Sequence, residues 1–163
     1  MKTLQDALKE KSKEEKHFEF TDKTETLPDG TVLHQIKATK DLPMHNVKKG
    51  DVGGWIGNPE NLSGNAWVSG DAIVSGNAWM ANNTHISGNA WVSGDARVSG
   101  KARVYGKAKV YGKAQVYGNA HIFGNVRVSG NAWVSGYAWL YGNTKVSGNE
   151  IINTGNYNKG DKK

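Results

Sequence analysis

Hydrophobic positions recur at intervals of six residues from Ser63 to Ile152. The stretch divides into fifteen consecutive hexads without an insertion, and the sixth position of every hexad is aliphatic or methionine. Alanine holds the fourth position in eleven hexads, and glycine holds the second in fourteen, with Asn82 as the one substitute. Because asparagine is the next-best residue for a left-handed backbone conformation, Asn82 fits the same local geometry.

Each hexad predicts a short β-strand followed by a corner. Alanine at position four and valine at position six alternate with outward residues, as in a strand with one buried face. The glycine at position two and the Asn, Asp or Lys after it are typical of a tight turn. Since the same face turns inward in every hexad, the strands form a coil around a core of alanine and valine, and the predicted fold class is all-β.

The hexads resemble those of the hexapeptide-repeat proteins. The segment Gly50–Ile56 (GDVGGWI) also resembles an element of small bacterial and phage members of this group, which are often labelled transferases. The resemblance implies a left-handed parallel β-helix with three hexads per coil, and therefore about five coils for fifteen hexads. It also implies a homo-oligomer, either a trimer or a dimer. For a phage protein, one implied function is to bind and inhibit a host factor.

The chain divides into four predicted parts. Residues 1–16 form a charged tail or a short helix, and residues 17–60 form an N-terminal β-hairpin cap with a turn at Pro28-Asp29-Gly30. Residues 61–152 form the β-helix, and residues 153–163 form a disordered basic tail.

Aromatic residues in the cap have two interpretations. Phe18, Phe20 and Trp55 form a hydrophobic plug over the first coil in one of them. A ligand pocket at the junction between cap and coil is the other. The open core at the end of a solenoid favours the plug.

Outward side chains at position five stack every eighteen residues. Three columns result, which we call face 1 (Trp67, His85, Arg103, His121, Trp139), face 2 (Ile73, Trp91, Lys109, Arg127, Lys145) and face 3 (Trp79, Arg97, Gln115, Trp133, Ile151). Five tryptophans occupy these columns: Trp67, Trp79, Trp91, Trp133 and Trp139. So many exposed aromatic residues predict a contact surface, and we expect self-association through them. The alternative is that they only shield neighbouring strands.

Basic residues concentrate in the middle of the repeats. Six of them occur with no acidic residue between them, and we call these the basic belt: Arg97, Lys101, Arg103, Lys107, Lys109 and Lys113. Tyr105, Tyr111 and Tyr117 fall in the same coil. Basic and aromatic residues together can bind the phosphates and bases of nucleic acid. However, lysines at three successive corners surround a coil, whereas a nucleic acid needs a stripe along one side. An acidic protein, a nucleic acid and a purely solubilising role all remain open for the belt.

The composition narrows the chemistry. The 163 residues include 21 glycines and no cysteine, and the formal net charge is +6. Without cysteine there is no disulfide framework and no thiolate metal site, and we expect no metal and no cofactor. No apolar run is long enough to span a bilayer, and the first residues lack the apolar stretch of a signal peptide. We therefore expect a cytoplasmic protein without a membrane partner.

Two histidines on face 1, His85 and His121, are the candidates for catalysis. The resemblance implies a histidine general base between subunits in an acyl- or acetyltransferase. Against this, Arg103 stands between the two rings, and no carboxylate lies in a neighbouring slot to orient either ring. We therefore expect a non-catalytic protein that self-associates and presents a basic-aromatic surface to a macromolecular partner. An acyltransferase and a nucleic-acid-binding protein are the alternatives.

Overall fold

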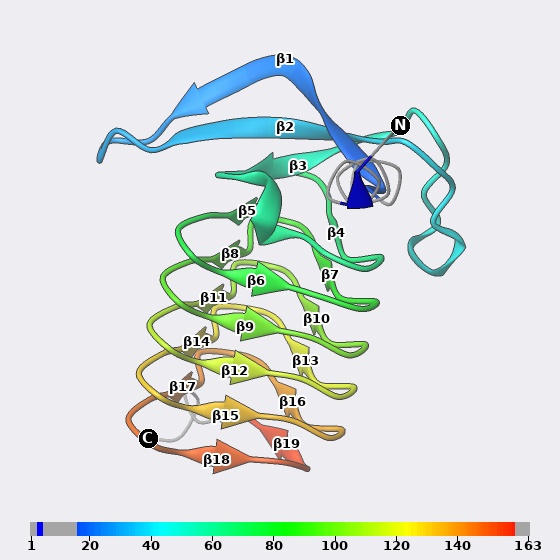
Figure 1. Cartoon of the computed structure of the whole chain (residues 1–163). Coiled ribbons are helices and arrows are strands. Elements are labelled where there is room, and N and C mark those ends of the chain that lie inside the picture. Colours follow the sequence, from blue (N-terminus) through cyan, green and yellow to red (C-terminus); the bar gives the residue numbers. More distant parts are fainter. Residues whose placement is uncertain (1–2, 5–15, 159–163) are drawn as a thin grey trace.

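Sixteen strands of two residues each, β4 to β19, wind around a common axis in three columns (Figure 1). The computed structural model describes residues 3–4 and 16–158. Face 1 is a sheet of β4 (Trp67–Val68), β7 (His85–Ile86), β10 (Arg103–Val104), β13 (His121–Ile122), β16 (Trp139–Leu140) and β19 (Asn156–Tyr157). Face 2 contains β5 (Ile73–Val74), β8 (Trp91–Val92), β11 (Lys109–Val110), β14 (Arg127–Val128) and β17 (Lys145–Val146). Face 3 contains β6 (Trp79–Met80), β9 (Arg97–Val98), β12 (Gln115–Val116), β15 (Trp133–Val134) and β18 (Ile151–Ile152).

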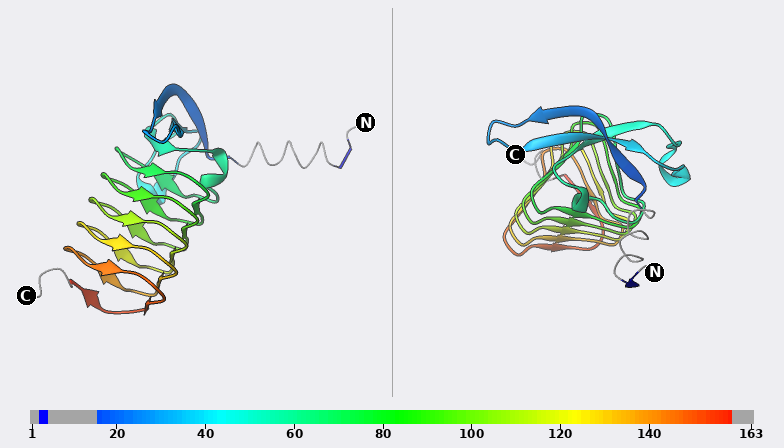
Figure 2. Two further views of the ribbon diagram at one scale, coloured as in Figure 1. Left: turned by 90° about the vertical axis from the view of Figure 1, so that its left-hand side faces the viewer. Right: turned by 45° about the horizontal axis from the view of Figure 1, so that its top comes forward.

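The coil is left-handed. In Figure 1 the chain crosses the near face from left to right along β6, β9 and β12 and returns behind them while it descends. Figure 2 shows the stacked coils from the side and partly along the axis. The predicted all-β, left-handed parallel β-helix is therefore confirmed.

Backbone hydrogen bonds join each coil to the next. The N–H groups at positions one, three and five of a hexad donate to the carbonyls at positions six, two and four in the coil below. In one hexad these bonds are Ser93 N to Val110 O at 2.9 Å, Asp95 N to Gly112 O at 2.7 Å, and Arg97 N to Ala114 O at 2.9 Å. The corners as well as the strands are thus paired.

The core consists of the side chains at positions four and six. The alanines and the aliphatic residues of these positions are buried in a continuous cluster along the whole coil. Two threonines take the place of alanine, and their hydroxyls are satisfied by backbone carbonyls: Thr84 donates to Ala81 O, and Thr144 donates to Tyr141 O at 2.8 Å. At both of these positions a carbonyl accepts the hydrogen of the hydroxyl that replaces an apolar side chain.

Glycine is needed at the corners for two reasons. The corner glycines have φ between 60° and 74°, and Asn82 adopts the same conformation at φ 57°. In addition, the corners of successive coils lie in close contact. A Cβ on Gly130 would come within 2.8 Å of the backbone nitrogen of Gly148, whereas a Cβ on Gly148 would meet nothing within 4 Å.

A hairpin and a third strand cover the N-terminal end. β1 (Phe18–Thr26) pairs antiparallel with β2 (Val32–Ala38), which pairs antiparallel with β3 (Val52–Ile56). β3 then pairs in parallel with β5, so one sheet of eight strands runs from the hairpin down face 2. Two single 3-10 turns, η1 (Pro43–His45) and η2 (Pro59–Asn61), lie on either side of β3.

The plug of the first coil differs from the prediction in one residue. Phe18 is buried in the core cluster and Phe20 packs against it. Trp55, however, is only half-buried, because it pairs with Ile73 and so occupies an outward slot at the start of face 2. Trp67 takes its place in the core.

The solenoid extends beyond residues 61–152 at both ends. β3 adds a strand before the first hexad, and β19 pairs in parallel with β16 within the segment expected to be a disordered tail. Tyr157 of β19 packs against the core from below. Residues 1–2, 5–15 and 159–163, on which the predicted N-terminal helix or tail and the end of the basic tail fall, lie outside the described residues.

Replacing Gly130 by alanine should destabilise the protein more than the same change at Gly148. Both positions have positive φ, which costs a non-glycine residue about 1–2 kcal/mol. Only the Gly130 side chain would also collide with the next corner, which adds about 1–3 kcal/mol. Chemical denaturation of the two variants measures the difference. Equal losses would show that the close contact between corners contributes nothing.

Candidate functional site

Face 1 brings histidines and an arginine together in one column. β7, β10 and β13 pair in parallel, and their register places Arg103 between His85 and His121. Trp67 lies above this group and Trp139 below it. The predicted order of outward residues on face 1 is therefore present in the structure.

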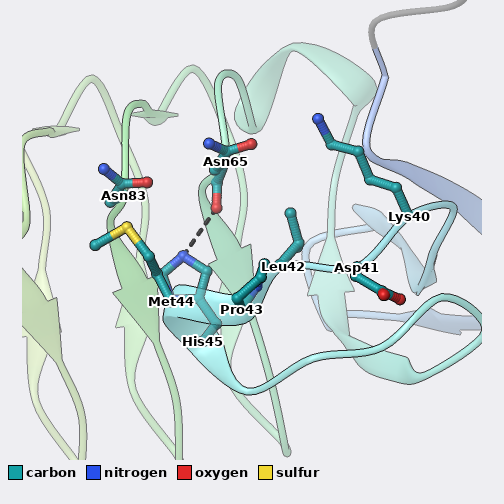
Figure 3. A pocket seen from close by; sticks show the side chains of 8 residues that line it. All are labelled: Lys40, Asp41, Leu42, Pro43, Met44, His45, Asn65 and Asn83. Atoms are coloured by element: carbon teal, nitrogen blue, oxygen red, sulfur yellow. Dashed lines mark hydrogen bonds between the residues drawn. The ribbon is translucent and has the colours of Figure 1, made fainter.

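A segment of the cap covers the upper end of face 1. We call Leu42–Val47 the overhang; it is closed by a bridge between its two end residues and contains η1. The His45 Nε2–H donates to the carbonyl of Asn65 at 2.9 Å, as Figure 3 shows. Beside it, the buried His17 Nε2–H donates to the carbonyl of Ala66 at 2.6 Å. Two imidazoles thus attach the cap to the first coil.

Trp67 does not lie on the outer surface. Its side chain is 1% exposed and belongs to the core cluster. Gly53 of β3 passes so close that a Cβ there would come within 2.7 Å of the indole ring. The expectation that Trp67 contributes to self-association is therefore wrong, because the cap covers it.

His85 lies where the overhang meets the coil. Its Nε2 forms a hydrogen bond of 3.0 Å with the Ser69 hydroxyl, and its ring centroid is 4.9 Å from that of His45. Burial, and to a smaller extent the charges of His45 and Arg103, lowers the pKa of His85 from 6.5 to about 4. The ring is therefore neutral at pH 7.

The Ser69–His85 pair has the spacing of a nucleophile and its base. No carboxylate of the described residues bonds to His85, and a base with a pKa near 4 has little driving force to take a proton at neutral pH. We therefore interpret the pair as a structural hydrogen bond.

His121 is held by aromatic stacking. Its ring centroid lies 5.0 Å from that of Trp139 at an interplanar angle of 28°. Burial and the nearby Arg103 charge both lower the pKa of His121. The arginine keeps His85 and His121 on separate rungs, and within the described part of the chain no group of three or more metal-ligating side chains comes together.

The basic belt encircles one coil as predicted. Arg97 lies on face 3, Arg103 on face 1 and Lys109 on face 2, with the three other lysines on the corners between them. None of the six cations forms an ion pair with a described residue. Tyr105, Tyr111 and Tyr117 follow three different strands, so they lie at three different edges.

Face 2 adds a feature that the belt alone does not show. Parallel pairing places Lys109, Arg127 and Lys145 on consecutive rungs, and all three are exposed. We call this column the basic stripe. The belt is visible in the sequence because its residues lie close together along the chain. The stripe is visible only when residues eighteen positions apart are compared.

Aromatic rings form a stacked ladder beside face 1. Tyr105, Phe123 and Tyr141 stack with centroid distances of 5.0 Å and 5.6 Å and interplanar angles of 5° and 10°. Since neighbouring rings cover each other's faces, the ladder presents mainly ring edges to the outside. Its contribution is to bind the coils together.

The other tryptophans differ in exposure. Trp79, Trp133 and Trp139 are 41%, 41% and 44% exposed. Trp91 is half-buried, its indole N–H donates to Ser75 Oγ at 3.3 Å, and Lys109 Nζ lies 6.0 Å from its ring centroid. Three of the five predicted contact tryptophans thus remain well exposed.

Comparison with known families agrees with this architecture. A family model described as YdcK beta-solenoid repeat matches residues 90–106, 114–129 and 120–136. The chain is a β-solenoid repeat protein. No curated protein matches the chain. Within the described part of the solenoid protein, no helix has the length and apolarity to cross a bilayer.

The stability of the solenoid should fall between pH 6.5 and 4. The unfolded chain binds a proton at His85 below about pH 6.5, whereas the folded chain does so only near pH 4. The free energy of unfolding is therefore unaffected by protonation of His85 above pH 6.5. It falls as the pH drops from 6.5 to 4, by an amount on the order of 3 kcal/mol. The lowered pKa values of His17 and His45 act in the same direction.

Chemical denaturation of the wild type and His85→Gln at several pH values between 7.5 and 4.5 checks this prediction. The free energy of unfolding of the variant should depend less steeply on pH. Measurements above pH 7 separate the loss of the Ser69 contact from the effect of protonation. Identical pH dependence in both proteins would contradict the role of His85.

Proposed function

We propose that the protein is a non-catalytic interaction protein that holds an acidic protein partner against face 2. The observation that carries the proposal is the basic stripe: three exposed cations on consecutive rungs, none of them paired with a described carboxylate. Lys107 and Lys113, at the corners on either side of β11, widen this positive surface. Uncompensated charge of one sign attracts a partner of the opposite sign and speeds its association.

The spacing of the stripe supports an acidic helix as the partner element. Neighbouring rungs lie about 4.8 Å apart. On a helix, side chains three or four positions apart have Cβ atoms separated by about 5–6 Å. One acidic face of a helix can therefore set successive carboxylates against Lys109, Arg127 and Lys145.

Nucleic acid is less well supported. Binding of bases requires open aromatic ring faces beside the cations. The rings of Tyr105, Phe123 and Tyr141 are stacked on one another, and the spacing between them leaves no room for a base. Tyr111 follows the Lys109 strand and is 38% exposed. It is not part of this stack of rings, so it offers a single ring beside face 2.

A transferase activity also has little support. It would need His85 or His121 as a base, but His85 is engaged with Ser69 and His121 with Trp139. The resemblance to phage proteins leads us to propose further that the acidic partner is a protein of the host. Binding of the solenoid would then inhibit that host protein.

Self-association is the second part of the proposal. Exposed apolar side chains gather near the C-terminal end of the solenoid, and we call them the C-terminal patch: Trp133, Tyr137, Trp139 and Ile151. Ile151 is 70% exposed and pairs directly below Trp133. The edges of β17, β18 and β19 at the same end have no further described strand beside them. A second copy related by a two-fold axis can cover both the apolar surface and these edges.

Charge reversal on face 2 should abolish binding of an acidic peptide. A fluorescein-labelled glutamate-rich helical peptide serves as the probe, and fluorescence anisotropy at low ionic strength measures its affinity. The variant with Lys109, Arg127 and Lys145 all changed to Glu should bind at least ten times more weakly, since three attractive contacts become repulsive. Binding to the wild type should weaken as salt is added.

The matched control carries the same change in net charge on the cap, with Lys40, Lys48 and Lys49 changed to Glu, and should retain binding. Equal losses in both triple variants would show that only net charge matters and would favour a solubilising belt. If an oligonucleotide binds more tightly than the peptide, the proposed partner is a nucleic acid and the acidic protein is ruled out.

The double variant Trp133→Ser/Ile151→Ser should dissociate the oligomer. We expect light scattering to give a dimer for the wild type and a monomer for this variant, because the removed side chains are the apolar centre of the patch. Trp79→Ser, on the same face near the other end, is the matched control and should leave the oligomer intact. A wild type that is monomeric at high concentration would refute self-association.

A further inference from the structure

The overhang leaves a polar hollow against face 1. This hollow has a volume of about 310 Å³ and lies between His45 of the overhang and the coil below it. Its coil side is formed by Asn83, Lys101, Arg103, Asn119 and His121. A second hollow of about 250 Å³ adjoins it, and Arg103 and His121 line both. Figure 3 shows the neighbouring part of the overhang, with Met44 beside Asn83 and His45 bonded to the carbonyl of Asn65.

Asn83, Lys101 and Asn119 reach the hollow from one column of corners. The backbone nitrogen of Asn83 donates to Gly100 O, and that of Lys101 donates to Gly118 O, at 2.8 Å and 2.7 Å. These bonds fix an amide, an ammonium and an amide on three successive rungs. Arg103 and His121 come from the strands beside this column. The rigid coil therefore supplies the arrangement, and the cap closes it from above.

The hollow carries positive charge without compensation. Lys101 and Arg103 both line it, and no carboxylate does. Neither cation forms an ion pair with a described residue. Two cations in a concave site concentrate the potential and favour an anion there.

Asn83 contributes a side-chain amide to the wall of the hollow. Its Oδ1 is buried and has no hydrogen-bond partner among the described residues. A ligand in the hollow does not reach this oxygen, so the amide N–H is the group that Asn83 offers to an anion.

We propose that this hollow binds a small phosphate monoester. Arg103 and Lys101 hold the phosphate oxygens, and the side-chain amide N–H groups of Asn83 and Asn119 donate further hydrogen bonds to them. A dianion with three terminal oxygens matches two cations and several donors better than a carboxylate does. The volume is about ten times the ~30 Å³ that a water molecule occupies in the liquid, which leaves space for the group that carries the phosphate.

The site is separate from the surface proposed for the acidic partner. The basic stripe lies on face 2, whereas this hollow lies on face 1 under the overhang. Either proposal can therefore fail while the other holds.

Calorimetric titration of the full chain with inorganic phosphate, ribose 5-phosphate and adenosine 5′-monophosphate tests the proposal. We expect saturable binding, tighter for the monoesters than for inorganic phosphate because only the monoesters carry a further group that fills the rest of the hollow. Arg103→Gln and Lys101→Gln should each weaken binding at least tenfold, and Asn83→Asp should do so by placing a carboxylate in the wall. Lys109→Gln, which removes the same charge from face 2, is the matched control and should leave the affinities unchanged.

Circular dichroism of each variant confirms that the coil is folded, so that a loss of binding reports on the site. Equal weakening by Lys109→Gln and Arg103→Gln would overturn the proposal, since it would mean that phosphate only senses net charge. Absence of saturable binding to all three probes would overturn it as well. A 5′-phosphorylated oligonucleotide distinguishes the source of the phosphate: binding that requires the terminal phosphate and Arg103 supports the site, and binding that is independent of both counts against it.

Discussion

The backbone hydrogen bonds between coils determine everything else in this molecule. Each hexad contributes three of them, two beside the strand and one at the corner, and they hold the chain at an eighteen-residue repeat. A strand of two residues has almost no stability of its own, so the pairing is maintained only because every neighbour is paired in the same way. The glycine corners are part of this arrangement, since they let successive backbones approach closely.

The same repeat organises the surface. Outward side chains that are far apart in the chain become neighbours on a face, and each face acquires its own chemistry. Face 2 gathers cations, face 1 gathers histidine, arginine and aromatic rings, and the lower part of face 3 is apolar. A regular core thus supports an irregular exterior, and our proposal of an interaction protein rests on the chemistry of this exterior.

The sequence predicts the coil well because the coil depends on local periodicity. The strands, the corner conformation of Asn82 and the columns of outward residues all follow from the hexad. The contacts of the cap do not, because they join residues of unrelated pattern. Trp67 occupies an outward slot, yet the cap buries it; Trp55 was expected in the plug, yet it lies outside. β19 escaped detection because its pairing with β16 shifts by one residue and a tyrosine replaces the aliphatic side chain. The hollow on face 1 likewise exists only because the overhang folds back over it.

Because the repeat is fixed, the number of residues inserted or deleted decides which face every later residue lies on. Removal of eighteen residues from the middle would delete one rung from every face and leave each remaining residue on its own side. Removal of six would keep the core pattern intact but rotate all later hexads by one third of a turn, so that Trp139 would move from the histidine side to another side. Insertions and deletions in this chain therefore fall into two kinds: those that change how long the molecule is, and those that exchange one face for another.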